Sequence, residues 1–436
     1  MNRWLDGYHR RSNSAGGFCT NEKLSWCNLS QEVDYSIYGA LIPVCFNTET
    51  LGHTAIGDFL VSTLGDYLIR MQFFSWIVMN EDPTRKEDLK VFIVNRYPPF
   101  TSVYRWASDL ADSLPYDKEI INLIYNRDNW VHDHQGIDFK GNLGTDFLTY
   151  LFRSVAFLNA RNYMIASSKS RRTFVHYTNQ FSGTLRIKNA CEIVNVQDSP
   201  YFLEDTSPAE RTYMKLLYKS LIDVKYVITN TDVLREELYR FGFKGKITTI
   251  HLPVGRSFVK LPTSKDSLRK SLGLPPSKKL VLSVSFNSPR KNLKTVEAVM
   301  DSLGREYVLV RVGKALKNSI TFKNIDDETL NKIYNACDFL LFPSLYEGFG
   351  LPIVEAFATG LPVVASNIPT IREVSGGAAI LVEPTRVDQI AGAAELAVRE
   401  SDKYSYLGLE RAKEFTLDNF RKRITNLYDS IISESE

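Results

Sequence analysis

The chain lacks the features that would mark a disulfide-rich, membrane-spanning or secreted protein. Its 436 residues include five cysteines, at positions 19, 27, 45, 191 and 337, which form no Cys-x-x-Cys pair and no dense framework. We therefore expect no cysteine-based metal site and a reducing compartment. No uninterrupted apolar run approaches the roughly 20 residues needed to span a bilayer. The polar and charged opening does not resemble a signal peptide.

The charge balance is weak as well. A net charge of +3 is too small to indicate nucleic-acid binding, and it fits either an anionic ligand or an anionic membrane surface. An apolar fraction of 44% and a charged fraction of 24% are typical of soluble globular proteins. The length allows two domains with separate cores. We expect a cytoplasmic protein, and peripheral contact with a membrane stays open.

Residues 1–88 differ from the rest of the chain. They contain a stretch rich in Asn, Ser and Gly and then an irregular apolar part, before the first clear strand at Lys90–Asn95. Two interpretations stay open. One is a genuine N-terminal extension that packs on the rest of the protein or on a membrane. The other, slightly favoured, is upstream sequence ahead of a start at Met79. We assign this segment no function.

The most informative stretch is Phe342–Glu355, which reads FPSLYEGFGLPIVE. It follows an apolar run of strand length and leads into a helix-like run with a proline near its start. Gly348 and Gly350 let the backbone approach a ligand closely, and free N–H groups at a helix start favour an anion. Glu347 and Glu355 lie at the two ends of the loop. The pattern predicts a site for a ligand that carries phosphates and sugar hydroxyls.

The segment EGFGLPIVE resembles the signature of the retaining glycosyltransferases of family 4, with seven residues between its two glutamates. Its flanks, Ala336–Asp338 and Gly360–Ala365, match as well, and the resemblance runs from about Leu89 to the C-terminus. It implies the α/β GT-B fold, in which two Rossmann-like domains have parallel sheets facing a central cleft and a C-terminal helix crosses back to the first domain. The expected parts are an acceptor domain at 89–255, a nucleotide-sugar donor domain at 256–416 and a crossover helix at 417–436.

Two cations follow the first predicted strand of the second domain, Leu280–Ser285. Arg290 and Lys291 match the Arg-Lys-Asn of the family, and they suit a diphosphate leaving group because arginine binds it bidentately and lysine adds a point charge. The resemblance implies that Glu355 binds the ribose hydroxyls and that Glu347 contacts the sugar. The catalytic candidates are thus Glu347, Arg290 and Lys291. The donor-binding candidates are Glu355, Gly348, Phe349, Gly350, Leu351, Gly313 and Ser285, the last of which replaces a family glycine.

The first domain carries the acceptor and sugar candidates. Thr101 and Ser102 stand where the family usually has paired glycines, so the backbone of this loop approaches a ligand less freely. Arg105 matches a commonly basic position, with a solvated helix face as an equal alternative. Gln197 stands where relatives usually have a histidine. With Asp198 it forms either a sugar or acceptor contact or a turn held by an Asp-Ser-Pro cluster.

The histidines predict no metal site. His132 and His134 are interpreted as polar surface, and His176 as a structural residue. The family needs no metal in its fold, so we expect no cofactor besides the nucleotide-sugar substrate. A linker rich in Pro, Ser and Lys is expected from Leu252 to about Lys278.

The resemblance implies transfer of a sugar from a nucleotide-diphosphate donor, GDP-mannose or a UDP-sugar, to a glycan or lipid-linked acceptor, with retention. Such an enzyme would act in polysaccharide or glycolipid biosynthesis. Two alternatives stay open. One is a catalytically decayed sugar- or nucleotide-binding protein, suggested by the altered first loop and Gln197. The other is a GT-B epimerase or phosphorylase, although no lysine stands in a diagnostic pyridoxal context. The oligomeric state is not predicted.

Overall fold

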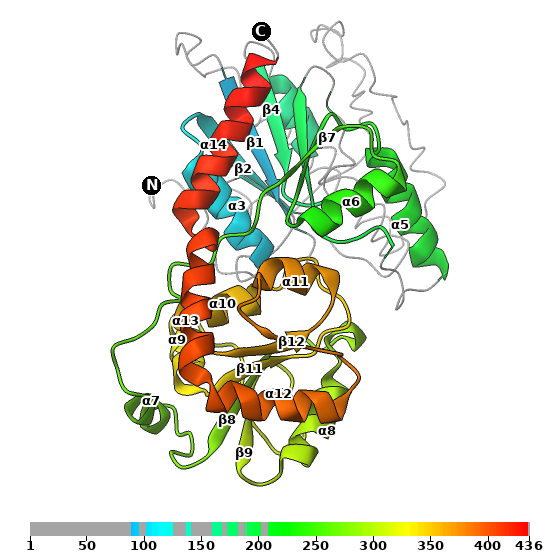
Figure 1. Cartoon of the computed structure of the whole chain (residues 1–436). Coiled ribbons are helices and arrows are strands. Elements are labelled where there is room, and N and C mark those ends of the chain that lie inside the picture. Colours follow the sequence, from blue (N-terminus) through cyan, green and yellow to red (C-terminus); the bar gives the residue numbers. More distant parts are fainter. Residues whose placement is uncertain are drawn as a thin grey trace, which may run out of the picture. The chain divides into compact units, whose positions relative to one another are not determined.

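The structure is a computed structural model that describes residues 89–95, 102–124, 137–140, 159–167, 172–181, 187, 190–201 and 208–434. The segment 1–88, the loop residue Thr101 and the pair His132 and His134 lie outside these residues. The described chain forms two parallel β-sheets with helices packed against them (Figure 1).

The first sheet has the strand order β3-β2-β1-β4-β5-β6-β7 among the described residues, and its pairings are parallel. All seven residues of β1 are buried, as expected for a parallel strand covered on both faces. The strands are β1 (Leu89–Asn95), β2 (Asp117–Ile124), β3 (Ile137–Lys140), β4 (Arg172–Tyr177), β5 (Cys191–Val196), β6 (Tyr226–Thr229) and β7 (Lys246–Thr249). The helices of this part are α3 (Ser102–Ser113), α5 (Pro208–Leu221) and α6 (Asp232–Phe241), and residues 159–167 are also helical.

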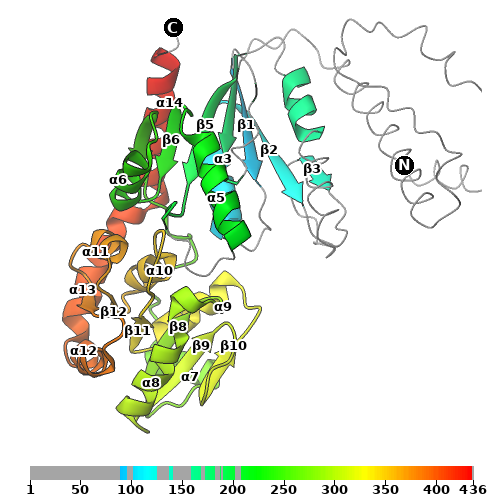
Figure 2. The same ribbon diagram turned by 90° about the vertical axis from the view of Figure 1, so that its right-hand side faces the viewer.

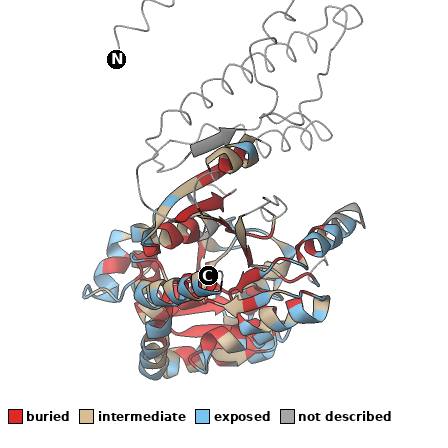
Figure 3. Cartoon of the chain, turned by 90° about the horizontal axis from the view of Figure 1, so that it is seen from above, coloured by how far each residue is buried: buried red, intermediate tan, exposed pale blue. Residues whose placement is uncertain are grey.

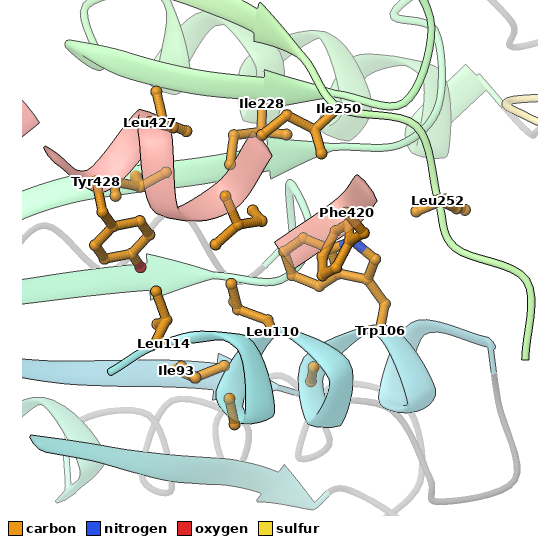
Figure 4. Packing of buried hydrophobic residues seen from close by; sticks show 14 of the residues in the cluster. Ile93, Trp106, Leu110, Leu114, Ile228, Ile250, Leu252, Phe420, Leu427 and Tyr428 are labelled. Carbon is orange, nitrogen blue, oxygen red and sulfur yellow. The ribbon is translucent and has the colours of Figure 1, made fainter. Parts of the chain in front are cut away.

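The last helix of the chain, α14 (Leu417–Ser433), packs on this first sheet and confirms the expected crossover. Its Phe420 and Tyr428 meet Trp106 and Leu110 of α3 in one buried cluster (Figure 4). His176 of β4 is fully buried in the same region, with Nδ1 2.8 Å from the Tyr428 hydroxyl. The histidine is therefore structural, as the sequence indicated.

The second sheet has the order β10-β9-β8-β11-β12-β13 among the described residues, again with parallel pairings. Its strands are β8 (Lys279–Val284), β9 (Tyr307–Val312), β10 (Ser319–Phe322), β11 (Phe339–Phe342), β12 (Val363–Ser366) and β13 (Ile380–Val382). Its helices are α8 (Leu293–Leu303), α9 (Asp327–Ala336), α10 (Leu351–Thr359), α11 (Pro369–Ser375), α12 (Val387–Arg399) and α13 (Ser401–Ala412). Figure 2 gives a second view of these elements.

The side chains of this sheet alternate between two apolar layers. Val281 packs with α8 and α12, whereas its neighbours Leu280 and Leu282 pack with α9 and α10. Figure 3 shows the result: strands are mainly buried, and helices carry both buried and exposed residues. Helices on both faces of two parallel sheets, with the last helix returning to the first sheet, are the architecture that the sequence predicted.

The expected linker is more ordered than its composition suggested. The helix α7 (Lys265–Ser271) lies inside it, with the Ser264 side chain accepting a hydrogen bond from the Ser267 amide at 3.4 Å. Leu268 joins the core of the second sheet. The helix α5 and the short strands β3 and β10 were likewise not expected from the sequence. Within the described residues, no helix is both long and apolar enough to cross a membrane.

Candidate functional site

The glycine loop lies between β11 and α10, as predicted. Gly350 has φ = 104° and occupies the N-cap position of α10, where no side chain caps the helix. A positive φ of this size strains any residue with a Cβ, so glycine is required. The Phe349 side chain is buried against His251 and Phe415, with ring centroids 6.0 and 5.8 Å away. Only the backbone of Phe349 is therefore left to contact a ligand. Leu351, the first residue of α10, packs against the same core.

The loop between β11 and α10 carries Glu347 and is called the acidic loop below. The loop after β8, residues 285–292, carries Arg290 and Lys291 and is called the cationic loop. A buried ion pair connects the two loops. The Lys291 ammonium lies 2.5 Å from Oε1 of Glu347, and the two side chains are only 11% and 7% exposed. The backbone supports this contact, because the Leu345 amide donates to the Arg290 carbonyl at 2.8 Å. Asn292, at φ = 53°, donates from Nδ2 to the Pro343 carbonyl at 3.0 Å. Two of the three catalytic candidates are thus in direct contact.

Arg290 contacts the first domain instead of either glutamate. Its Nη1 lies 3.6 Å from Oδ1 of Asp198, and its side chain is 33% exposed. Next to this pair, a Cβ on Gly348 would lie 2.1 Å from the Gln197 carbonyl oxygen. The Ser199 amide donates to the Tyr346 hydroxyl at 2.6 Å. The segment 197–199 of the first domain therefore lies directly against the loop that carries Glu347.

The Gln197 side chain is held within its own domain. Its Nε2 donates to the Thr178 carbonyl at 2.9 Å, and its backbone amide donates to Oε1 of Gln180 at 3.1 Å. Of the described residues, none hydrogen-bonds its Oε1, which is the atom left for a ligand. Ser102 is the first residue of α3, and Thr101 lies outside the described residues.

Glu355 lies in a buried network that joins the two domains. The Tyr334 hydroxyl of α9 donates to its Oε2 at 2.8 Å, and Nη1 of Arg105 lies 3.6 Å from its Oε1. Arg105 also donates to Oδ1 of Asp327 at 3.0 Å. Burial raises the pKa of Glu355, and Arg105 and Tyr334 oppose that change. Arg105, for which a solvated helix face was one alternative, instead contacts two acids of the second domain.

Ser285 and Gly313 come together at the carboxyl ends of β8 and β9. Gly313 has φ = 134°, and a Cβ there would lie 2.4 Å from the Ser285 carbonyl oxygen. The buried Arg311 of β9 contacts both oxygen atoms of Ser285. Its Nη2 donates to the Ser285 carbonyl at 2.6 Å and to the Ser285 hydroxyl at 3.0 Å. Arg311 was not among the candidates selected from the sequence, although an arginine inside an apolar strand was a usable signal.

A further contact between the domains involves Glu373 of α11. Its carboxylate accepts hydrogen bonds from the amides of Asp232 and Val233, at 2.7 and 2.9 Å. These amides start α6, whose N-cap is Thr231. A carboxylate at this position stabilises the helix start. Within the described residues, no group of three or more His, Cys, Asp or Glu could hold a metal ion.

Comparison with known proteins agrees with this geometry. Residues 264–414 match the family described as glycosyl transferases group 1. The chain is 25% identical over 377 residues to the O-antigen chain mannosyltransferase B of Escherichia coli, covering 76% of this chain and 96% of that protein. It is 24% identical over 241 residues to the serotype-specific mannosyltransferase WbdA of Escherichia coli, covering 50% of this chain but 29% of that longer protein.

Two solved structures have a similar fold. Sucrose-phosphate synthase from Thermosynechococcus elongatus has a TM-score of 0.67 and 17% identity, covering 79% of this chain and 100% of that one. Anabaena HepE, in complex with UDP and glucose, has a TM-score of 0.62 and 16% identity, covering 78% of this chain and 99% of that one. The chain therefore has the GT-B fold, and its residues 264–414 match the family described as glycosyl transferases group 1.

Proposed function

We propose that the chain is a retaining hexosyltransferase of family 4, which moves a sugar from a nucleotide-diphosphate donor to a glycan or lipid-linked acceptor. The observation that carries this proposal is the buried contact of Lys291 with Glu347, because it joins the cationic loop to the acidic loop. The names of the relatives support a mannosyl donor, and the UDP and glucose bound to HepE support a nucleotide sugar. GDP-mannose is the first donor to test, and UDP-sugars are the second.

Each charged residue has a role in this proposal. The departing diphosphate gains negative charge, which Arg290 and Lys291 stabilise. Glu347 stabilises the positive charge that develops at the anomeric carbon. Glu355 binds the ribose hydroxyls and shares its carboxylate with Arg105. Removing one preorganised contact of this kind typically costs roughly 10²–10³ in rate.

The stereochemistry and the cofactor requirement complete the proposal. Retention without a protein nucleophile fits attack on the same face that the diphosphate leaves, and the diphosphate oxygens guide the acceptor. The cationic loop takes over the neutralisation of the leaving group, so we propose transfer without a metal. Gln197 and Asp198 contact the transferred sugar or the acceptor. A lipid-linked acceptor would bring this cytoplasmic enzyme to a membrane surface as a peripheral protein.

The test starts with binding and ends with product. GDP, UDP and ADP are compared by thermal shift, and the matching nucleotide sugars are then supplied with candidate acceptors. We expect one base to stabilise the protein, transfer from its sugar, and an α-linked product from an α-donor by NMR. Activity should be unchanged by EDTA. Inversion of the anomeric centre, or loss of activity on chelation, would contradict the finer parts of the proposal.

The alternative functions give different results in the same assay. A decayed binding protein would be stabilised by a nucleoside diphosphate and yet hydrolyse and transfer nothing. An epimerase would change the sugar without any acceptor, and a phosphorylase would release sugar phosphate only when inorganic phosphate is supplied. The engagement of the Gln197 side chain by Thr178 makes the decayed protein the alternative that most needs this test.

A further inference from the structure

The second sheet contains a fully buried arginine at the edge where the candidate donor residues lie. Arg311 is 0% exposed. Its Nη1 donates to the carbonyl oxygens of Ser283 and Val312, both at 2.9 Å. Its Nη2 donates to the carbonyl and the hydroxyl of Ser285, at 2.6 and 3.0 Å. All of these oxygens belong to the carboxyl ends of β8 and β9 or to the residue that follows β8.

No described carboxylate lies within ion-pair distance of the Arg311 guanidinium, and its Nε has no hydrogen-bond partner among the described residues. Burial lowers the pKa of Arg311 to about 10, so the side chain stays charged at neutral pH. A buried charge without a counter-ion is costly, and proteins normally pair it. Arg311 is therefore an exception that calls for an explanation.

Another buried arginine of the same domain shows the usual solution. Arg269 is 6% exposed and also donates to carbonyl oxygens, among them that of Ala336 at 2.9 Å. Its Nη2, however, lies 2.7 Å from Oδ2 of Asp338, which also accepts a hydrogen bond from the Leu280 amide. This pair lies at the amino ends of β8 and β11. The unpaired arginine lies at the carboxyl ends, beside Ser285 and Gly313.

We infer that Arg311 is a positioning residue for the donor, and that the donor diphosphate supplies the negative charge missing beside it. This inference rests on the proposed function. The carboxyl ends of parallel strands present carbonyl oxygens, which repel an anion. Arg311 binds three of these oxygens and makes the edge electrostatically favourable for phosphate. The Ser285 hydroxyl accepts from Arg311, so its own hydrogen is left to donate to a phosphate oxygen.

Arg311 also acts through the cationic loop. The loop starts at Ser285, which Arg311 holds, and ends at Asn292, which is fixed by its hydrogen bond to the Pro343 carbonyl. Between these two points lie Arg290 and Lys291. An arginine that fixes the start of the loop therefore helps to set where the two cations meet the leaving group.

The experiment measures binding along a series of ligands that differ in charge. The nucleoside, monophosphate and diphosphate of the base selected in the thermal-shift panel are titrated into wild type, Arg311→Met, Arg311→Lys and the matched control Arg269→Met. For Arg311→Met we expect diphosphate affinity to fall about tenfold or more. The affinity for the monophosphate should fall less, and the affinity for the nucleoside should not change. Arg311→Lys should recover part of the loss, and Arg269→Met should bind all three ligands as wild type does.

Steady-state kinetics give a second readout. Arg311→Met should raise the donor KM more than it lowers kcat. Where this variant does not fold, Arg311→Gln replaces it, because glutamine keeps donors for the carbonyl oxygens without the charge. Equal weakening of all three ligands, or an unchanged diphosphate affinity in a folded neutral variant, would overturn the inference alone. If wild type binds none of the diphosphates, the proposed function fails first.

Discussion

Removing the negative charge from the ion pair between Lys291 and Glu347 should affect stability, diphosphate binding and turnover in different directions. In Glu347→Gln the Lys291 ammonium, 11% exposed, loses its anionic partner. Removing one partner of a buried pair typically costs about 3–5 kcal/mol of folding free energy. At roughly 2–4 °C per kcal/mol for a domain of this size, the midpoint of thermal unfolding should fall by at least about 6 °C.

A nucleoside diphosphate should reverse much of that loss, because its phosphates neutralise the lysine that has lost its partner. The thermal shift on adding diphosphate should therefore be larger in Glu347→Gln than in wild type. Turnover should instead fall by roughly 10²–10³, since the group that stabilises the developing positive charge is gone. Tighter product binding together with slower transfer is the combination expected of a residue that serves the transition state.

The assays are differential scanning fluorimetry with and without the diphosphate, and initial rates of transfer. Glu414→Gln is the control, because Glu414 forms a 2.6 Å ion pair with Arg411 but is 51% exposed. Its loss should cost no more than about 1 kcal/mol and leave transfer unchanged. Transfer of sugar by Glu347→Gln at the wild-type rate would contradict the role given to this carboxylate. Weaker protection of the variant than of wild type by diphosphate would contradict the role given to Lys291.

Two further predictions concern close packing and pH. Gly348→Ala should lower both stability and turnover, because its Cβ would lie 2.1 Å from the Gln197 carbonyl oxygen. Gly392→Ala in α12 is the control, because its Cβ would have no atom within 4 Å. This control should be neutral or stabilising by up to about 1 kcal/mol. Equal unfolding midpoints for the two variants would contradict this. Burial lowers the pKa of His176 to about 4, so the unfolded chain binds the proton more readily and stability falls as pH drops below about 6.5. Wild type should lose about 2 kcal/mol from this residue between pH 7 and pH 5. His176→Gln should lack that loss in urea titrations at the two pH values.

Much of the fold could be predicted because local signals agreed with the final packing. The crossover helix, expected at 417–436, begins at Leu417 and ends at Ser433. Thr231 and Gly242 cap α6 through local signals, since a side-chain acceptor and a glycine in the left-handed region satisfy the helix ends. The helix α7 was missed because a short polar segment shows little periodicity, and Leu268 is its one buried apolar residue.

The site was predicted less completely because its contacts join distant segments. Glu347 and Lys291 were both selected from the sequence as catalytic candidates, and the structure brings their side chains into contact. No local pattern could reveal that Arg105 would reach Glu355, because that contact depends on how two domains meet. For the same reason the partner of Arg290, Asp198, was proposed as a ligand contact and not as its ion-pair partner.

The return of α14 to the first sheet has a consequence for biosynthesis. The ribosome releases the strands of that sheet long before residues 417–433, which supply Phe420, Ile424 and Tyr428 to its core. Until residues 417–433 have been synthesised, the apolar face that these side chains cover has no partner. The strands of the first sheet must therefore wait, exposed to aggregation or held by chaperones, until α14 can pack on them.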